Sequence, residues 1–402
     1  MRVIIVGAGE VGSHIAASLA DDHEVIVVDI DPETIEDLTY STDVLAIEGD
    51  GTTIETLQEA VIAKAELLVA STEDDKTNLV TCMTAKTAGD IFAIARVRGA
   101  KFYDTWTQSN GAFDVDFMVS TDLVTAEKVV RILGFPSAVD VEPFAQNRVE
   151  MAEFEIQADS EIVDQTIETA DRFDALTFAA LVRDSNIVIP RGGTRIEAGD
   201  KVIVIGRPDR VRAFSNVVAP TNQSDGIQDF VVVGGSDIGY HIADSLEQRG
   251  FRPRLIVESG DRARHLAEQL PDITDLDFFL RENVDDADAV IAAADSDEEN
   301  LLVSLLAMKI GVDRTVAVVE AAEYAGLFED VGIDVAINPR DTTAEEIVRY
   351  TRDRTIEKLS LIEDRQAEVL EIEIVEPGDH VILFTTTDVR SDVLAVVSGP
   401  RR

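Results

Sequence analysis

The chain has 402 residues and a formal net charge of −43 at pH 7, because 78 Asp and Glu residues outnumber 35 Lys and Arg residues. This acid surplus disfavours a nucleic-acid partner, since neutralising phosphates requires a basic surface. The single cysteine, Cys82, excludes an intrachain disulfide and a CxxC metal site, and the five histidines are too scattered to form a ligand cluster.

The length supports more than two domains of ordinary size. Hydrophobic residues make up 45% of the chain, so the acids belong to the solvated surface of folded domains rather than to disorder. Only 8 of the 35 basic residues are lysine. This composition resembles that of proteins from salt-accumulating halophiles, in which molar salt screens self-repulsion. No apolar run reaches the roughly 18 residues of a spanning helix, so we expect a soluble, cytoplasmic protein without a signal peptide or direct membrane insertion.

The beginning of the chain carries a dinucleotide-binding pattern. The β-branched run Val3–Val6 predicts a buried strand, which leads into Gly7–Gly12 and a helix that continues to Leu19. A second apolar run, Val25–Val28, ends on Asp29. A strand, a G-x-G-x-x-G motif that opens a helix, and an acid about 20 residues later together form the Rossmann nucleotide fingerprint.

Each residue type in this fingerprint has a physical reason. Gly7 permits a tight turn, Gly9 lets the backbone approach a pyrophosphate, and Gly12 lets helix and strand pack closely. The helix N-terminus offers free N–H groups and a positive dipole to phosphate. Asp29 can accept hydrogen bonds from a ribose 2′-OH and would repel a 2′-phosphate, which favours NAD over NADP.

Strands and helices then alternate through the rest of this unit. Further strands are expected at residues 44–47, 67–70, 92–97 and 117–119. The alternation predicts an α/β fold with a doubly wound parallel sheet, whose ligands bind outside the carboxyl ends of the strands. Asp50, Thr72, Glu73 and Arg96 fall at or near such ends. Arg96 either pairs bidentately with a pyrophosphate or forms a surface ion pair, and its spacing fits both equally.

The whole unit recurs in the second half of the chain, as an internal repeat of entire domains. Phe230–Val233 leads into Gly234, Gly235, Ser236, Asp237, Ile238 and Gly239, and the next apolar run ends on Glu258. The offset between matching positions falls from 227 at the glycine motif to 222 at Asn78 and Asn300 and to 218 at Ala126 and Ala344. Falling offsets indicate small deletions in the second copy.

The second copy departs from the fingerprint where a phosphate would bind. Ser236 replaces the middle glycine and places a Cβ where backbone must approach phosphate. Val318 stands at the position of Arg96, which removes the cation, and seven residues are missing after Glu258, together with the counterpart of the turn at Asp50. Glu258 still allows ribose binding, so the second site is expected to be weak or structural.

A small α+β module follows each large unit. Short alternating runs after residue 149 predict the first module, and the second lacks 39 residues, which leaves one or two strands that pack only with help. The predicted boundaries are 1–134 for the first Rossmann domain, 140–218 for the first module, 219–227 for a linker, 228–355 for the degenerate Rossmann domain and 361–402 for the truncated module.

These motifs resemble those of the TrkA family, the peripheral NAD-binding regulatory subunits of Trk potassium-uptake systems. Members carry two tandem RCK (KTN) domains, each followed by a TrkA-C module, and the resemblance covers essentially the whole chain. Its most specific features are Val6–Gly12, Gly49–Thr52, Thr72 with Asp74-Asp75 and Asn78-Leu79, Ala95-Arg96, and Pro190–Thr194 with Gly199-Asp200.

The resemblance implies a set of binding residues and a ligand. The cofactor-binding residues it implies are Gly7, Ala8, Gly9, Glu10, Val11 and Gly12 around the pyrophosphate, Asp29 at the adenosine ribose, and Asp50, Thr72, Glu73 and Arg96 completing the site. A weaker second site would use Gly234, Gly235, Ser236, Asp237, Ile238 and Glu258. The expected ligand is NAD or NADH, with ATP or ADP as alternatives, and no catalytic or metal-binding residue is expected.

Three classes of function compete. An NAD-dependent oxidoreductase would need an acid/base group near the nicotinamide, and no His, Lys or Tyr–Lys constellation follows the nucleotide unit. A regulator explains the duplication, because two pseudo-equivalent lobes form half of a symmetric ring. We favour a nucleotide-sensing subunit that gates a TrkH-like, Trk-type potassium-translocating membrane subunit, as a dimer of two-lobed chains at the inner face of the membrane. An RCK-type regulator of another potassium channel or antiporter is the third class.

Overall fold

The first sheet is built from strands that are apolar on both faces. β1 (Arg2–Val6) and β2 (Glu24–Asp29) bury all of their apolar side chains, as parallel strands covered by helices on both faces do. The strand order is β3-β2-β1-β4-β5-β6 with all neighbours parallel, which confirms the predicted doubly wound sheet. The remaining strands are β3 (Leu45–Glu48), β4 (Leu67–Ala70), β5 (Phe92–Val97) and β6 (Phe117–Ser120).

The computed structural model describes residues 1–21, 23–109, 112–135, 137–145, 147–183, 186–218, 229–257, 282–351, 356–362, 367–373 and 380–386. The predicted linker 219–227 lies outside these residues, as does Glu258. Within the described chain, Met1–Glu127 and Val231–Thr351 form one compact unit, and Lys128–Phe230 with the strands after residue 355 forms a second. None of the described helices is both long and apolar enough to cross a membrane.

Helices connect the strands of the first lobe, and short polar side chains cap several of them. Asp74 accepts a hydrogen bond from the backbone N–H of Thr77 at 2.7 Å, which satisfies a free donor in the first turn of α4. The helices are α1 (Glu10–Leu19), α2 (Pro32–Ser41), α3 (Ile54–Glu59), α4 (Asp75–Ala88), α5 (Ala100–Gln108) and α6 (Thr121–Leu133), with 3-10 turns η1 (Ile62–Lys64) and η2 (Ala112–Asp114).

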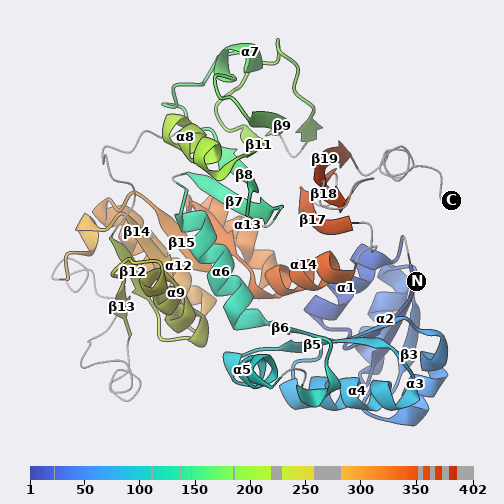
Figure 1. Cartoon of the computed structure of the whole chain (residues 1–402). Helices are drawn as coiled ribbons and strands as arrows, with labels where there is room; N and C mark the ends of the chain where they lie inside the picture. The colour runs from blue at the N-terminus through green and yellow to red at the C-terminus, as the bar shows by residue number, and fades with distance from the viewer. Residues whose placement is uncertain are drawn as a thin grey trace. The chain divides into compact units, whose positions relative to one another are not determined.

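The described residues of the second lobe form a second parallel sheet, of order β13-β12-β14-β15-β16 (Figure 1). Its strands are β12 (Phe230–Val233), β13 (Arg254–Ile256), β14 (Ala289–Ala292), β15 (Thr315–Val318) and β16 (Val335–Ile337). Its helical segments are α9 (Asp237–Gln248), η3 (Val284–Asp286), α12 (Asp297–Ile310), α13 (Ala322–Asp330) and α14 (Pro339–Thr351).

Matching hydrogen bonds show that the two lobes are copies. Asn78 donates from its amide nitrogen to the backbone oxygen of Arg96 at 2.9 Å, and Asn300 donates likewise to Val318 at 2.9 Å. Both asparagines are fully or almost fully buried. Both the asparagines and their acceptor residues are 222 positions apart, so the two bonds confirm the predicted equivalence of Arg96 and Val318.

The two Rossmann lobes, which belong to the same compact unit, contact each other through α14. Figure 1 shows α14 beside α1, and His14 Nδ1 lies 3.0 Å from Asp341 Oδ1. Farther along α14, the Tyr350 ring stacks on Phe117 with a centroid separation of 3.7 Å. A helix of the second lobe is therefore fixed against the helix that follows the first glycine motif.

The second unit holds the smaller modules, whose strands pair antiparallel. Arg183 forms a two-pronged ion pair with the buried Asp200, with both N–O distances at 2.7 Å, which pins the Gly199-Asp200 turn. The first module has sheet order β10-β9-β11-β8-β7. Its elements are β7 (Ala138–Phe144), β8 (Val149–Glu155), α7 (Ile167–Ala170), β9 (Leu176–Arg183), β10 (Asn186–Val188), β11 (Lys201–Gly206) and α8 (Pro208–Val218).

The C-terminal part contributes three strands rather than the one or two expected. They are β17 (Ile356–Ile362), β18 (Ala367–Glu373) and β19 (His380–Thr386). Ala367 and Val369 share a hydrophobic cluster with Phe144 of the first module, and Glu371 accepts a hydrogen bond from the Ala145 backbone N–H at 2.8 Å. The short sheet thus packs on the first module, as a fragment too small for its own core must.

Candidate nucleotide-binding site

A cavity of about 820 Å³ lies at the carboxyl edge of the first sheet. This volume is within the range of small-molecule and cofactor sites. Nine of the eleven residues predicted for the first site line it: Gly7, Gly9, Glu10, Val11, Asp29, Asp50, Thr72, Glu73 and Arg96. Ala8 and Gly12 are buried and are not among the lining residues.

Glycine is found at the three positions of the motif for different structural reasons. Gly7 has φ +102°, a left-handed conformation that side chains rarely adopt. A Cβ on Gly12 would stand 1.8 Å from the Gly7 carbonyl oxygen, so helix and turn are in direct backbone contact there. A Cβ on Gly9 would meet nothing within 4 Å. Protein packing requires Gly7 and Gly12, whereas Gly9 faces open space that a ligand can occupy.

Asp29 joins the glycine turn to the end of β2. Its carboxylate accepts hydrogen bonds from the backbone N–H groups of Ala8 at 2.6 Å and Asp31 at 2.9 Å. A carboxylate offers about four acceptor positions, so capacity for a ribose hydroxyl remains. Asp29 therefore orders the phosphate-facing turn as well as lining the cavity.

Asp50 is held in a local turn. Its carboxylate accepts from the Thr52 hydroxyl at 2.7 Å and from the Thr52 backbone N–H at 2.9 Å. The hydroxyl bond, followed by the backbone bond, lowers the pKa of Asp50, so it is a carboxylate at neutral pH. The neighbouring Gly51 is required by packing, because a Cβ there would stand 2.2 Å from a Val6 methyl group.

A buried asparagine that sequence reasoning did not assign to the site holds two of its loops together. Asn78 accepts from the Thr72 backbone N–H at 2.9 Å and from its hydroxyl at 2.7 Å, and it donates to the backbone oxygens of Thr72 and Arg96. It thereby fixes the ends of β4 and β5. Its presence in both copies of the repeat is the signal that could have identified it.

Arg96 points from β5 into the cavity, and its Nε donates to Thr121 Oγ1 at 3.1 Å. No carboxylate of the described residues lies within 4.0 Å of the Arg96 guanidinium. Within the described chain, Arg96 therefore does not form the surface ion pair that was the alternative to phosphate binding. Burial, and then the nearby charge of Arg340, lower the pKa of its guanidinium. Glu73 and Asp75 oppose this shift from a distance, but no described carboxylate pairs directly with the guanidinium, so it can pair with a phosphate.

Arg340, which sequence reasoning missed, lines the same cavity from the second lobe. It lies in the first turn of α14, and its guanidinium contacts the carboxylate of Glu10. No local motif predicts this residue, because its place depends on how α14 packs against α1. The cavity is thus completed by both lobes.

The described residues fit a nucleotide. The open face at Gly9, the first turn of α1 and the guanidinium of Arg96 suit a phosphate chain, and the carboxylate of Asp29 suits a ribose hydroxyl.

Comparisons with known proteins agree with this architecture. The TrkA-N domain model matches residues 3–120 and 230–339, and the TrkA-C domain model matches residues 151–219. A Trk system potassium uptake protein TrkA homolog from Methanosarcina mazei is 36% identical over 386 residues, which cover 92% of this chain and 94% of the relative. One from Archaeoglobus fulgidus is 33% identical over 370 residues, covering 90% and 84%.

The chain belongs to the TrkA family.

Solved structures with the same fold include RCK domains. The crystal structure of the GsuK RCK domain superposes with a TM-score of 0.63 at 14% identity and covers 98% of this chain and 95% of its own. The GsuK channel bound to NAD gives a TM-score of 0.63 at 15% identity, covering 97% and 77%. At these identities the likeness establishes the fold alone, two RCK-type Rossmann lobes with a smaller module.

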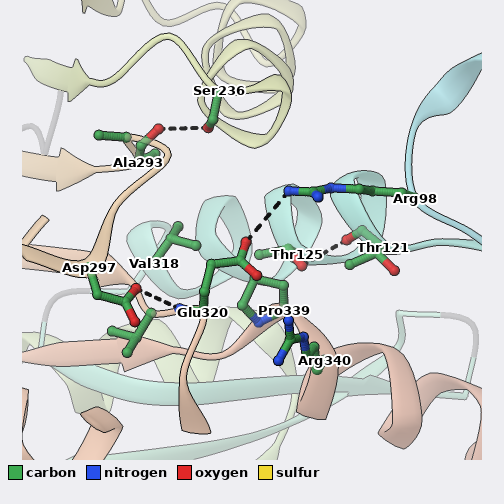
Figure 2. Close-up of polar contacts among 12 residues, drawn as sticks. Arg98, Thr121, Thr125, Ser236, Ala293, Asp297, Val318, Glu320, Pro339 and Arg340 are labelled. Carbon is green, nitrogen blue, oxygen red and sulfur yellow. Dashed lines mark hydrogen bonds and ion pairs between the residues drawn. The ribbon is translucent and has the colours of Figure 1, made fainter. Parts of the chain in front are cut away.

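The second TrkA-N copy has a cavity of about 150 Å³ at the matching place. Ser236 caps α9 there: it donates to the Ala293 backbone oxygen at 2.6 Å (Figure 2). It also accepts from the Gly239 backbone N–H at 3.0 Å. The serine therefore uses an N–H group that a phosphate would need. Gly234, Gly235, Asp237 and Ile238 form the turn and the first turn of α9, and Glu258 lies outside the described residues.

This second cavity is acidic. Asp122 enters it from α6, and Asp237, Asp295 and Glu320 also line it. Arg98 is the basic residue in its lining, and its Nη2 lies 3.9 Å from Glu320 Oε1 (Figure 2). Among the described residues, no group of three or more His, Cys, Asp or Glu is arranged to hold a metal ion. Both linings contain more acids than bases, but the first contains two arginines, Arg96 and Arg340, whereas the described lining of the second contains Arg98 alone, which faces Glu320. The second cavity therefore offers less positive charge to a phosphate.

We expect the free energy of unfolding to fall as pH rises, because Asp122 must lose a proton inside the folded protein. Burial, only partly offset by Arg98, raises its pKa from 3.8 to about 7. The folded state then binds one proton more than the unfolded state between about pH 4 and 7, so the free energy of unfolding decreases across that window. We expect Asp122→Asn to stabilise the protein by roughly 2 kcal/mol at pH 8.

Urea unfolding of the wild-type protein and of Asp122→Asn at pH 5, 6, 7 and 8, at constant molar KCl, measures this effect. The difference between the two proteins should be small at pH 5 and grow towards pH 8. A difference that does not change with pH would contradict a raised pKa.

Proposed function

We propose that this protein is a nucleotide-sensing regulatory subunit that gates a Trk-type, TrkH-like membrane potassium transporter. The observation that carries the proposal is one cavity in which the open face of Gly9 and the guanidinium of Arg96, which pairs directly with no described carboxylate, meet at the first turn of α1. The relatives that are named Trk system potassium uptake proteins support the transport role.

The first TrkA-N lobe is the main binding site, and the nine predicted residues that line its cavity contact the nucleotide. NAD or NADH is the expected ligand, with ATP or ADP as alternatives; the structural neighbours include GsuK with NAD and with ADP. The second lobe binds nucleotide weakly or serves structure, because Ser236 occupies the Gly239 N–H group, and because Val318 and Asp122 stand where the first site has Arg96 and Arg340.

The binding role involves no chemistry on the ligand. Gating requires only that the nucleotide bind one arrangement of the lobes more tightly than another. We propose that the working form is a dimer of two-lobed chains, which provides a four-lobed ring, held at the inner face of the membrane through its partner subunit.

The test is potassium flux through a TrkH-like subunit in vesicles, with the full chain added at molar KCl together with NAD, NADH, ATP or ADP. At least one nucleotide should change the flux several-fold, and Asp29→Ala should remove the nucleotide dependence by weakening binding tenfold or more. Glu36→Ala is the matched control, because Glu36 is an exposed acid on α2 outside the cavity lining.

Different outcomes separate the three classes of function. Nucleotide binding that depends on Asp29 without any effect on a Trk-type subunit would favour a regulator of another potassium channel or antiporter. Steady NADH oxidation by the purified protein, lost in Asp29→Ala, would instead favour an oxidoreductase.

A further inference from the structure

Arg340 belongs to the second lobe but lines the nucleotide cavity of the first. Its guanidinium Nη1 contacts Glu10 Oε2, and its Nη2 lies 4.0 Å from Glu73 Oε1. Glu10 is the first residue of α1, where the helix dipole and free N–H groups favour a negative charge. The Glu10 carboxylate therefore stands at a position that also suits a phosphate.

The backbone around Arg340 is held firmly in place. Asn338 accepts hydrogen bonds from the backbone N–H groups of Arg340 at 2.8 Å and Asp341 at 2.9 Å, and it donates to the backbone oxygens of Val319 and Glu320. These bonds cap α14 and tie it to the end of β15. The start of α14 is thus preorganised, and a ligand does not have to order it.

Two arginines from different lobes converge on this cavity. The charge of Arg340 is one of the causes that lower the pKa of Arg96, so the two guanidiniums repel each other. Glu10 offsets part of this repulsion by pairing with Arg340. A ligand with several negative charges would offset more of it, because it can interact with both cations at once.

The second copy provides a comparison inside the same chain. At the 218-residue offset, Arg340 corresponds to Asp122. Each of the two residues lines the cavity of the lobe to which it does not belong. The equivalence is supported by matching bonds: Thr125 donates to the Thr121 oxygen and Thr343 to the Pro339 oxygen, each at 2.7 Å. The lobe with the intact glycine motif thus receives a cation, and the degenerate lobe receives an acid.

We propose that Arg340 is a phosphate-binding residue of the first site, supplied by the second lobe, which selects nucleotides by the charge of their phosphate chain. The inference rests on the proposed nucleotide site. The phosphate chain replaces Glu10 as the partner of Arg340, so a bound ATP or ADP is held by both lobes. A nucleotide with fewer phosphates, such as AMP, leaves Arg340 with Glu10.

The test is calorimetric titration of the full chain with ATP, ADP and AMP at molar KCl. Arg340→Gln should weaken ATP binding by about ten- to a hundredfold, ADP binding by less, and AMP binding by less than about threefold. Arg340→Lys should retain part of the preference for ATP. Arg349→Gln is the matched control, because Arg349 lies on the same helix and pairs with Glu346 at 2.7 Å.

A double-mutant cycle tests the exchange of partners. Glu10→Gln should tighten ATP binding several-fold in the wild-type background and have little effect in Arg340→Gln, because the competing carboxylate matters only while Arg340 is present. Thermal melting of each variant without nucleotide shows whether the fold is retained.

The outcomes distinguish this inference from the proposed function. If Asp29→Ala weakens all three nucleotides but Arg340→Gln weakens none, or weakens all three equally, the role of Arg340 is wrong and the site stands. If Asp29→Ala leaves all three affinities unchanged, the proposed nucleotide site itself is wrong.

Discussion

Gly9→Val is expected to abolish nucleotide binding at the first site while leaving the protein folded. The backbone at Gly9 has φ −65° and ψ −174°, which any residue adopts, and a Cβ there meets nothing within 4 Å. The free energy of unfolding should therefore change by less than about 1 kcal/mol. A valine side chain would fill the space through which a pyrophosphate approaches the turn, so affinity should fall by more than about a hundredfold.

Gly12→Ala provides the contrasting variant within the same motif. Its Cβ would stand 1.8 Å from the Gly7 carbonyl oxygen, so the turn or α1 must move. This change should lower the free energy of unfolding by about 3 kcal/mol, measured by urea unfolding at molar KCl. If nucleotide binding survives Gly9→Val but is lost in Ser236→Val, the main site lies in the second lobe, and its assignment to the first lobe is wrong.

Much of the fold could be predicted because buried parallel strands are continuous apolar runs. The predicted bounds of β4 and β5, residues 67–70 and 92–97, coincide with those in the structure. The helix between these two strands, α4, begins at Asp75, because Asp74 supplies the cap. The third C-terminal strand was not expected, since its packing on the first module depends on tertiary contacts that the local pattern does not encode.

The candidate site was predictable where its chemistry is local. Gly7, Gly9 and Asp29 lie within one βαβ unit, so their spacing alone indicates their positions. Arg340 is more than 300 residues from the motif it faces, and only the packing of α14 on α1 brings it there. The repeat in the sequence was enough to recognise Asn78 and Asn300 as matching positions. It did not indicate which backbone groups their side chains bond.

High salt is expected to stabilise the protein strongly. The 43 uncompensated acids repel one another, and α2 illustrates this locally: it carries Glu33, Glu36 and Asp37 without any basic residue. The Debye length falls from about 10 Å at 0.1 M salt to about 3 Å at 1 M. We expect the melting temperature to rise by more than about 10 °C between 0.1 and 2 M KCl, and the proposed dimer to loosen on dilution into low salt.

Thermal melting and light scattering across a KCl series measure both effects, and NaCl at the same ionic strength should act equally if screening is the cause. A variant with Glu33→Gln, Glu36→Gln and Asp37→Asn should melt higher than the wild-type protein at 0.1 M and nearly equally at 2 M, because screening removes the repulsion that the substitutions relieve. A melting temperature that is independent of salt, or an equal gain in the variant at both concentrations, would show that self-repulsion does not limit this fold.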